Sequence, residues 1–495
     1  MPDKLLLAID QGTTGSTALV VTLTGETRGR ATVDFPQHFP KPGWVEHDAK
    51  EIWSSVEAAV KGALAKAGVR GEDVAAIGIT NQRETTLVWD RKTHEPIHRA
   101  IVWQCRRTAD TCKQLEADGV SPRVRDKTGL VLDAYFSGTK VAWILDAVDG
   151  ARARADRGEL AFGTIDCFLV HRLTGGDVHA TDVTNASRTL LMDLRSLAWD
   201  DELLRIFRVP ASVLPKIVGS AEVVAHTRGV GFLPDGIPIA GIAGDQQAAL
   251  FGQACFDEGD AKCTYGTGAF ALANIGKRVV LSERGLVTTV AWKVGGETTY
   301  ALEGSAFIAG AAVQWLRDGL GIIQSASEVE ALASQVSSSE GVTFVPALAG
   351  LGAPYWDPNA RGTIGGLTRG STRAHVARAT LEGIAFSVLD LLGAMAADAG
   401  RPLTKLRVDG GACANGLLMQ TQADLANVIV ERPTEIESTG SGAAMLAGLG
   451  AGLSDIGAVR RMWKHDRSFS PTIGEAERAQ RTAAWRRAVA AARLA

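Results

Sequence analysis

The stretch Asp10-Gln11-Gly12-Thr13-Thr14 places one carboxylate and two hydroxyl groups at a tight turn. The apolar run Leu5 to Ile9 predicts a strand that leads into this turn. Such a turn exposes consecutive backbone N–H groups that can bind phosphate, and Gly12 allows close approach. Asp10 beside it can hold a Mg²⁺ ion, directly or through water. Taken alone, the motif more commonly means a plain Asx/Thr hairpin, and the chain contains no GxxxxGK[ST] P-loop.

Two later turns have a composition that suits ligand binding. Tyr265-Gly266-Thr267-Gly268 again offers a hydroxyl and glycines after a strand, and two such hairpins facing one cleft could bind a polyphosphate from both sides. Asp409-Gly410-Gly411, followed by Ala414-Asn415, predicts a strand-to-helix turn that could lie flat against a nucleotide. An ordinary Gly-rich connection is the alternative for this second stretch.

Asp245 follows the apolar run Ile237 to Ala243 and precedes the apolar run Ala248 to Phe251. Both runs are expected to be buried, so the carboxylate needs a partner, and the proton of a substrate hydroxyl would serve. The alternative is an N-cap for the following helix. The spacing alone leaves both roles open.

The predicted strand Val74 to Thr80 leads into Asn81-Gln82-Arg83-Glu84. A guanidinium fork next to a carboxylate suits vicinal hydroxyls, which donate and accept at once. A surface ion pair is the commoner meaning of such a dipeptide. The stretch Leu351 to Pro358 is apolar and rich in turn residues, which predicts an ordered loop packed on another part of the protein.

The elements that must position these residues alternate along the chain. The first turn opens a predicted three-strand meander that ends near Phe35, followed by a helix that stops at Gly68. A strand, a Gly/Thr turn and further strands return about 255 residues later, which indicates a faint internal repeat. The longest predicted helix has Val376 to Met395 along one face, and the last twenty residues predict an Ala/Arg helix over the core. Because no low-complexity linker separates the halves, we expect two packed domains with a cleft between them.

Composition narrows the class of protein. The chain has 495 residues, with 52 Lys and Arg against 55 Asp and Glu and a formal net charge of -3. At about 150 residues per domain, this length predicts two to four domains. Hydrophobic residues make up 46% and charged residues 22%, which excludes a disordered chain. The near-neutral charge argues against nucleic acid or an anionic membrane as the main partner.

Targeting and cysteine patterns favour a cytoplasmic enzyme. No segment reaches the roughly 18 uncharged apolar residues of a membrane span, and the stretch Gly442 to Leu453 predicts a buried helix instead. The apolar run at the N-terminus stops at Asp10, too early for a secretory signal. The six cysteines form no CxxC pair and no His/Cys cluster, so neither structural zinc nor a disulfide framework is expected.

Taken together, the motifs resemble the FGGY family of carbohydrate kinases, which phosphorylate polyols and pentuloses, and within it the branch that acts on glycerol. The resemblance runs from Leu5 to at least Gly448, in order and nearly end to end. The blocks that carry it are Asp10–Thr14, Lys41–His47, Ile79–Thr85, Ile101–Arg107, Tyr135–Lys140, Thr184–Arg188, Gly241–Gln247, Thr264–Gly268, Gly350–Pro358 and Val408–Gly411.

The resemblance implies an α/β fold of two actin-like, ribonuclease-H-like domains with an interdomain active-site cleft. Residues 1–252 would form a domain with the polyol site and phosphate hairpin, and residues 253–495 a nucleotide-binding domain. ATP and Mg²⁺ would bind in the cleft, glycerol would be converted to sn-glycerol 3-phosphate, and the family expectation is a homodimer or homotetramer. We therefore expect glycerol and ATP as partners, with no nucleic acid and no membrane span.

The resemblance also implies a role for each matching residue. Asp245 would be the general base, and Asp10 would serve the metal. The glycerol site would be formed by Arg83, Glu84, Tyr135, Asp245 and Gln246, with Phe270 as an apolar wall. The nucleotide and its phosphates would be bound by Thr13, Thr14, Gly15, Thr267, Gly310, Gln314, Gly411 and Asn415.

Two alternatives stay open at this point. One is a kinase of another small polyol or ketose, such as erythritol, xylulose or ribulose, although Phe270 would fill the room that a longer sugar needs. The other is a non-catalytic actin-like nucleotide switch, which has no use for Arg83, Glu84 and Asp245 together. One departure concerns the first hairpin, where Thr17 stands in place of an arginine found in many glycerol-phosphorylating members, so that one cationic phosphate contact is missing.

The stretch His226 to Gly236 lacks the Gly-Gly-Thr-Arg loop with which some bacterial members bind fructose 1,6-bisphosphate. We therefore predict that this sugar phosphate does not inhibit the enzyme. Initial rates of acceptor phosphorylation measured across millimolar additions of fructose 1,6-bisphosphate check this, and strong inhibition would refute it.

Overall fold

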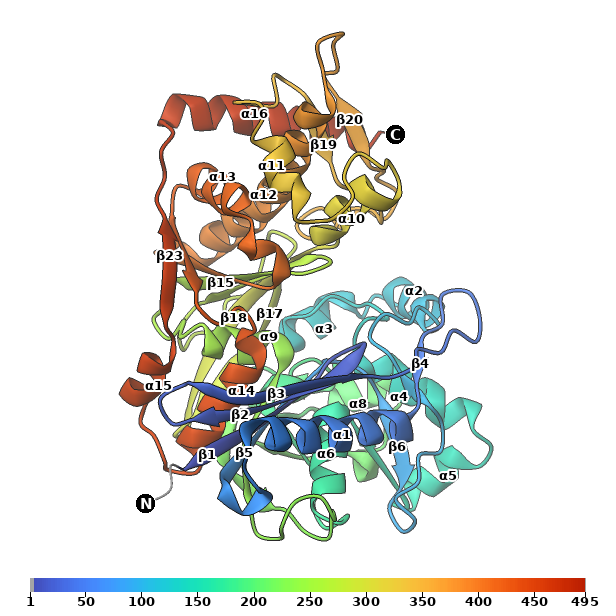
Figure 1. Ribbon diagram of the computed structural model, residues 1–495. Helices are drawn as coiled ribbons and strands as arrows, with labels where there is room; N and C mark the ends of the chain where they lie inside the picture. Colours follow the sequence, from blue (N-terminus) through green and yellow to red (C-terminus); the bar gives the residue numbers. More distant parts are fainter. Residues whose placement is uncertain (1–3, 495) are drawn as a thin grey trace.

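The computed structural model describes residues 4–494, and one long mixed β-sheet runs through both halves of the molecule (Figure 1). In spatial order its strands are β23 (His465–Phe469), β22 (Ile429–Pro433), β21 (Lys405–Asp409), β15 (Asp260–Tyr265), β16 (Ala269–Asn274), β18 (Glu297–Ala306), β17 (Val287–Val294), β13 (Ala221–His226), β14 (Pro238–Gly244), β5 (Val74–Asn81), β1 (Leu5–Gln11), β2 (Gly15–Thr22) and β3 (Thr27–Asp34).

The two halves of this sheet repeat the same strand order. In the N-terminal half, β3, β2 and β1 are antiparallel, and β5 and β14 continue from β1 in parallel. In the C-terminal half, β18, β16 and β15 are antiparallel, and β21 and β22 continue from β15 in parallel. The halves meet where β13 pairs with β17 at Ala221 and Val294. The internal repeat indicated by the two Gly/Thr turns is therefore present in the topology.

The predicted strands and helices of the N-terminal half are confirmed. The strands β1, β2, β3, β5 and β14 lie where periodicity placed them, and α1 (Ala49–Ala67) ends at Gly68 in the left-handed conformation. In the C-terminal half, β18 lies next to the hairpin β15–β16 in the sheet, and β17 lies on the other side of β18. Strand order here thus departs from a plain meander, since β18 returns between β16 and β17.

Helices cover the sheet and fill the space between its halves (Figure 1). Helix α12 (Arg373–Ala399) covers the C-terminal half, and α16 (Glu475–Ala492) packs on it through Phe386 and Trp485, whose rings stack at 5.2 Å. The remaining helices are α2 (Ala109–Ala117), α3 (Ser121–Thr128), α4 (Ser137–Ala147), α5 (Ala151–Asp156), α6 (Ile165–Leu173), α7 (Val183–Ala186), α8 (Asp201–Phe207), α10 (Gly310–Asp318), α11 (Glu328–Ala333), α13 (Gly416–Ala426) and α15 (Ile456–Met462), with α9 and α14 described below.

Short strands complete the fold as two-stranded sheets at the edges of the two halves. They are β4 (Glu46–His47) with β7 (Ala100–Ile101), β6 (Leu87–Asp90) with β8 (Leu160–Gly163), β9 (Ala180–Asp182) with β12 (Lys216–Val218), β10 (Met192–Asp193) with β11 (Ala198–Trp199), and β19 (Thr343–Val345) with β20 (Thr363–Gly365).

Two helices cross between the halves. Helix α9 (Asp245–Gly252) follows β14 yet packs on β15, β16 and β17, whereas α14 (Ser438–Gly450), late in the chain, packs on β14, β5 and β1. Figure 1 shows α14, in orange-red, beside the blue N-terminal strands. The two helices also pack on each other. Helices from the middle and from the late part of the sequence therefore hold the halves together.

The most apolar helices and the cysteines are largely buried in the fold. Within residues 4–494, only α12 is long and apolar enough by composition to cross a membrane, and 72% of its most apolar window is buried in the fold, as in a core helix. Helix α14 contains the apolar stretch predicted to be buried, and most of it is. All six cysteines are free and buried.

Close packing of α9 against α14 depends on glycine at Gly442. A Cβ atom at this position would overlap the carbonyl oxygen of Ala248 and the backbone of Gly252. We predict that Gly442→Ala lowers the free energy of unfolding by about 1–3 kcal/mol, because the two helices must move apart. Gly393→Ala is the control: a Cβ there, in α12, meets no atom within 4 Å, so helix propensity alone should raise stability by up to about 1 kcal/mol. Urea denaturation of both variants measures this, and equal effects would contradict the packing argument.

Candidate active site

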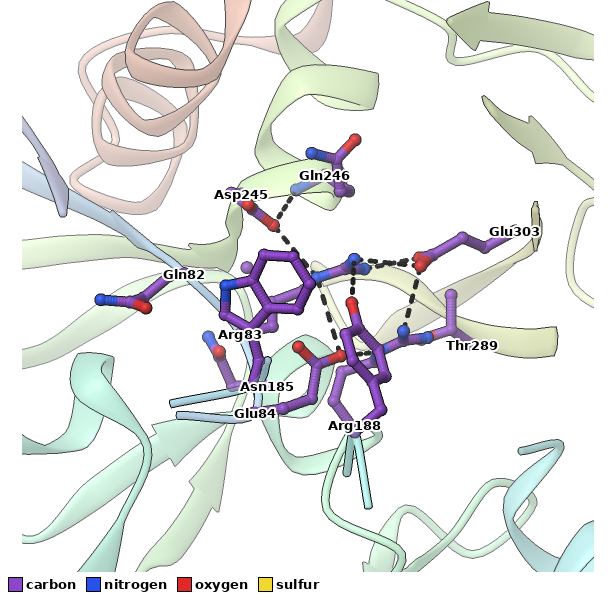
Figure 2. Close-up of polar contacts among 12 residues, drawn as sticks. Gln82, Arg83, Glu84, Asn185, Arg188, Asp245, Gln246, Thr289 and Glu303 are labelled. Carbon is purple, nitrogen blue, oxygen red and sulfur yellow. Dashed lines mark hydrogen bonds and ion pairs between the residues drawn. The ribbon is translucent and has the colours of Figure 1, made fainter. Parts of the chain in front are cut away.

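Arg83 lies at the centre of a buried polar cluster, two residues beyond the end of β5 (Figure 2). Its Nη1 and Nη2 atoms donate to the two carboxylate oxygens of Glu303 at 2.5 and 3.0 Å. Its Nε is 3.0 Å from Asp245 Oδ1, and Nη2 lies 3.5 Å from the Tyr135 hydroxyl. All three guanidinium nitrogens of Arg83 thus have polar partners, and these contacts fix the plane of the group.

Glu84 and Arg188 extend this cluster. Arg188 Nε donates to Glu84 Oε1 at 2.7 Å, and its Nη2 donates to Glu303 Oε1 at 3.0 Å. We call Arg83, Glu84, Arg188 and Glu303 the Arg–Glu network. The four side chains are at most 5% exposed, and they alternate in charge, so that each carboxylate contacts guanidinium groups. Two buried charges of each sign therefore balance.

The two carboxylates of the network differ in their proton affinity. Burial favours the neutral acid in both, but Arg188 and Arg83 outweigh it at Glu303 and lower its pKa to about 2. At Glu84, burial prevails over Arg188 and Arg83, and the pKa is raised. Glu303 is therefore a permanent anion, whereas the charge of Glu84 depends on Arg188.

The main chain at Glu84 is also held in an unusual conformation. Its φ of 59° lies in the left-handed region, which is costly for a residue other than glycine. Three side chains donate to its carbonyl oxygen: Thr86 Oγ1 at 3.0 Å, Ser137 Oγ at 3.1 Å and Lys140 Nζ at 3.3 Å. Lys140 Nζ also donates to the carbonyl of Tyr135 at 2.5 Å, and burial lowers its pKa to about 7. This lysine ties together the backbones of two predicted polyol-binding residues.

Asp245 is the first residue of α9, directly after β14. Its Oδ1 accepts from the backbone N–H of Gln246 at 2.7 Å and faces Arg83, while the side chain stays 33% exposed. The N-cap of α9 is Gly244 and no side chain caps the helix, so the predicted capping role of Asp245 is wrong. Its role as a base stays a prediction, and its carboxylate is the most accessible acid of the cluster. Gln246 itself is mostly buried, and Lys262 Nζ donates to its Oε1.

Tyr135 packs among aromatic rings, whereas the place of Phe270 follows from its strand. Tyr135 packs edge-on against Trp103, with ring centres 5.6 Å apart, and against Phe136 at 5.0 Å. Phe270, partly buried on β16, pairs with Ser305 on β18. Because residues two apart on a strand share a face, Phe270 lies on the same side of the sheet as Glu303. Arg83, Glu84, Tyr135, Asp245 and Gln246 therefore lie in one region, and for Phe270 the register shows only that it is on the same face of the sheet as Glu303.

Asp10 and the first hairpin form a second group. The hydroxyl of Thr13 accepts from Trp103 Nε1 at 2.9 Å, Thr14 is exposed, and a Cβ at Gly15 would lie 2.7 Å from Asp34 Oδ1. Burial, then Asp245 and Glu437, raise the pKa of Asp10 from 3.8 to about 7, and the positive charge of Arg30 only partly opposes this. A carboxylate in such surroundings lacks cationic charge, which fits a divalent cation as its partner.

The predicted nucleotide residues of the C-terminal half gather around the second hairpin. The Thr267 carbonyl accepts from Ala309 N at 2.8 Å, and a Cβ at Gly310 would lie 2.6 Å from the carbonyl oxygen of Gly266. Gln314 is exposed one turn further along α10. Gly410, with φ of 81°, lies against the Tyr265 carbonyl.

Gly411 and Asn415 continue this group. A Cβ at Gly411 would meet no atom within 4 Å, so space is open above it, and Asn415 caps α13 by accepting from Leu418 N at 2.9 Å. Strand β3 approaches this region through Arg30, whose Nη2 lies 3.4 Å from Glu437 Oε1. The neighbouring Ile436 carbonyl accepts from Gly410 N at 3.1 Å.

Sequence reasoning assigned no role to four buried residues of the site. Arg188 and Lys140 lie inside family-like blocks but were not singled out, and Glu303 and Lys262 were missed. Glu303 follows the apolar stretch Tyr300–Leu302 on β18, and Lys262 follows Ala261 on β15. A charged residue inside an apolar strand requires a buried partner, which is the signal that could have found them. Among residues 4–494, no group of three or more His, Cys, Asp or Glu side chains is arranged to hold a metal ion.

The raised pKa of Asp10 predicts a pH-dependent stability. The folded protein holds this proton more tightly than the unfolded chain, so stability falls as pH rises from about 4 to about 7. Asp10→Asn removes the ionisation, and we expect it to be more stable than the parent protein at pH 8, on the order of 1–3 kcal/mol, with no difference near pH 4. Thermal unfolding in EDTA at both pH values measures this, with the exposed Asp34→Asn as control. A parent protein as stable as Asp10→Asn at pH 8 would contradict the assignment.

Comparisons with known proteins show which family the chain belongs to. Residues 5–252 match the N-terminal domain of the FGGY family of carbohydrate kinases, and residues 261–451 match its C-terminal domain. The chain is 58% identical over 489 residues to a protein named glycerol kinase from Myxococcus xanthus, covering 98% of this chain and 99% of that one. It is also 58% identical over 491 residues to one of the same name from Deinococcus radiodurans, covering 99% and 98%.

A solved structure extends the likeness to the fold. The crystal structure of Plasmodium falciparum glycerol kinase with ADP superposes with a TM-score of 0.93 at 37% identity, covering 99% of this chain and 98% of that one. The predicted fold class, two actin-like, ribonuclease-H-like α/β domains, is confirmed. By family match, sequence identity and fold, the chain belongs to the FGGY family of carbohydrate kinases.

Proposed function

We propose that this enzyme transfers the γ-phosphoryl group of ATP to a terminal hydroxyl of glycerol, giving sn-glycerol 3-phosphate and ADP. The observation that carries the proposal is that Tyr135 and Asp245, which lie far from Arg83 in the chain, both come within 3.5 Å of its guanidinium. The relatives at 58% identity over nearly their whole length are named glycerol kinases, which supports the same acceptor.

The site suits a small and wholly polar acceptor. Arg83 donates, the carboxylate of Glu84 accepts, and Tyr135 can do both, so that vicinal hydroxyls would find complementary partners. A buried site of this kind rejects analogues that lack a hydroxyl, because its own polar groups would then be left unpaired. The ring of Phe270 on the facing strand would limit the length of the acceptor. This favours glycerol over erythritol, xylulose or ribulose.

Asp245 is proposed as the general base. As the acceptor oxygen attacks the γ-phosphorus, its O–H bond breaks and the proton passes to the Asp245 carboxylate, while the bond between the γ-phosphorus and the ADP oxygen breaks. The exposure of Asp245 leaves one edge of the carboxylate open to an incoming hydroxyl. Arg83 and the Gln246 N–H hold the group in place meanwhile.

The nucleotide is proposed to lie between the two hairpins. Thr13, Thr14, Gly15 and Thr267 would contact its phosphates, and Gly310, Gln314, Gly411 and Asn415 would line the rest of its site. Asp10 would hold Mg²⁺, which when bound neutralises phosphate charge. We further propose a cytoplasmic homodimer or homotetramer, with the boundary between the two domains near residue 252.

A panel of acceptors tests the proposed reaction. ADP release is followed in a coupled assay with ATP and Mg²⁺ in the presence of glycerol, erythritol, xylulose, ribulose or no acceptor. We expect release with glycerol and little with the others. Turnover only with a longer acceptor would replace glycerol by that sugar, and nucleotide binding without any acceptor-dependent release would favour a non-catalytic nucleotide switch.

Replacement of the base gives a second prediction. Asp245→Asn keeps the helix N-terminus occupied by a polar group of the same shape, so the fold should be retained, but kcat should fall about 10²- to 10⁴-fold. Asp201→Asn is the matched control, because Asp201 is likewise the first residue of a helix, α8, and its side chain is exposed. Turnover of Asp245→Asn within a few-fold of the parent enzyme would exclude Asp245 as the base.

A further inference from the structure

The side chains of Arg83 and Glu84, proposed to bind the acceptor, are held in their orientations by contacts with other residues. Arg83 uses the outer ends of its fork, Nη1 and Nη2, on Glu303, and the distances of 2.5 and 3.0 Å make this its tightest contact. Its contacts with Asp245, at 3.0 Å, and Tyr135, at 3.5 Å, lie on the other edges. An incoming hydroxyl can compete for these two contacts, whereas Glu303 is buried behind the guanidinium.

Glu84 depends in the same way on Arg188. The Arg188 side chain is 1% exposed, and it contacts Glu84 and Glu303 without touching Asp245 or the Tyr135 hydroxyl. Its guanidinium carbon lies 5.2 Å from the ring centre of Phe136, which fixes it from a further side. Arg188 thus reaches the proposed acceptor site through Glu84 and Glu303 and through the ring of Tyr135, whose centre lies 5.8 Å from its guanidinium carbon.

The network leaves little freedom for its members to compensate for one another. Without Arg188, Glu84 and Glu303 would compete for Arg83, which would turn away from Asp245. Without the charge of Glu303, the guanidinium groups of Arg83 and Arg188 would face each other with only Glu84 between them. Either change alters the groups that meet the acceptor although neither changed residue contacts it.

We propose that Arg188 and Glu303 are positioning residues for acceptor phosphorylation, which hold Glu84 and Arg83 in the arrangement that binds the acceptor hydroxyls. Glu303 lies in the stretch that matches the C-terminal family domain, and the other three members lie in the N-terminal one. The acceptor site of one domain is thus set by a carboxylate of the other. This inference rests on the proposed function, because it assigns the acceptor to Arg83 and Glu84.

The test compares Arg188→Met, Arg188→Lys and Glu303→Gln with the parent enzyme, measuring kcat and the KM for glycerol and for ATP separately. We expect Arg188→Met and Glu303→Gln to raise the KM for glycerol about tenfold or more and to lower kcat, with the KM for ATP within about threefold. Arg188→Lys keeps the charge but loses the fork, so it should lie between them.

A pH profile gives a readout that a merely structural role would not move. Because Arg188 stabilises the Glu84 anion, Arg188→Met should move the acid limb of kcat/KM for glycerol upward by about one pH unit. The matched control is Arg107→Met. Arg107 is also a fully buried guanidinium with one Nη atom unpartnered, a carboxylate partner, Glu46, at 2.7 Å, and aromatic rings around it, but it lies outside the network. Arg107→Met should lower the melting temperature and leave both the KM for glycerol and the pH profile unchanged.

The outcomes separate the two proposals. If folded Arg188→Lys and Glu303→Gln proteins keep kcat and the KM for glycerol within twofold of the parent enzyme, the positioning role is wrong while the proposed function stands. If Arg107→Met changes the KM for glycerol as much as Arg188→Met, the effect is general destabilisation and the inference fails. A parent enzyme without glycerol-dependent ADP release contradicts the proposed function itself. Should Arg188→Met not fold, circular dichroism shows this, and the other two variants decide.

Discussion

The ion pair between Arg83 and Glu303 is the contact on which the site depends. A guanidinium buried this deeply would severely destabilise the fold if it had no carboxylate partner. The buried carboxylate would do the same without its guanidinium. Because Arg83 follows β5 of the N-terminal half and Glu303 lies on β18 of the C-terminal half, each half supplies the charge that the other needs. The pair therefore fixes the relative placement of the halves at the same point where it fixes the acceptor-binding face of Arg83.

The repeated topology explains why the polar groups meet there. In each half, a Gly/Thr hairpin follows the first strand, and a parallel strand ends beside it: β5 beside β1, and β21 beside β15. The ends of these strands carry Asp10, Arg83 and Asp409, and the crossing helices α9 and α14 bring the ends of the two halves together. Asp245 occupies the start of α9, so the proposed base is carried by an element that belongs to one half in sequence and packs on the other.

Local pattern was sufficient to predict most elements but only part of the site. The strands around Asp10 and Asp245 were predictable because apolar runs stop there at turn residues, and α1 because its apolar spacing stops at Gly68. The insertion of β18 between β16 and β17 was not, because it depends on long-range pairing that no local pattern encodes. For Glu303, a charge inside an apolar strand could have indicated that it needs a buried partner, but not which one, since Arg83 and Arg188 are 220 and 115 residues away.

The carboxylates of the site fall into two electrostatic classes, and this division explains how they could serve different tasks. Glu303 has guanidinium partners and is ionised down to a pH of about 2, so its charge is a fixed part of the fold. Burial, and then the acidic neighbours Asp245 and Glu437, raise the pKa of Asp10 to about 7. Arg30 is drawn toward Glu437 instead, at 3.4 Å. Fixed arginines thus organise the acceptor side, whereas Asp10 has more negative than positive charge around it, which a nucleotide-bound cation would offset.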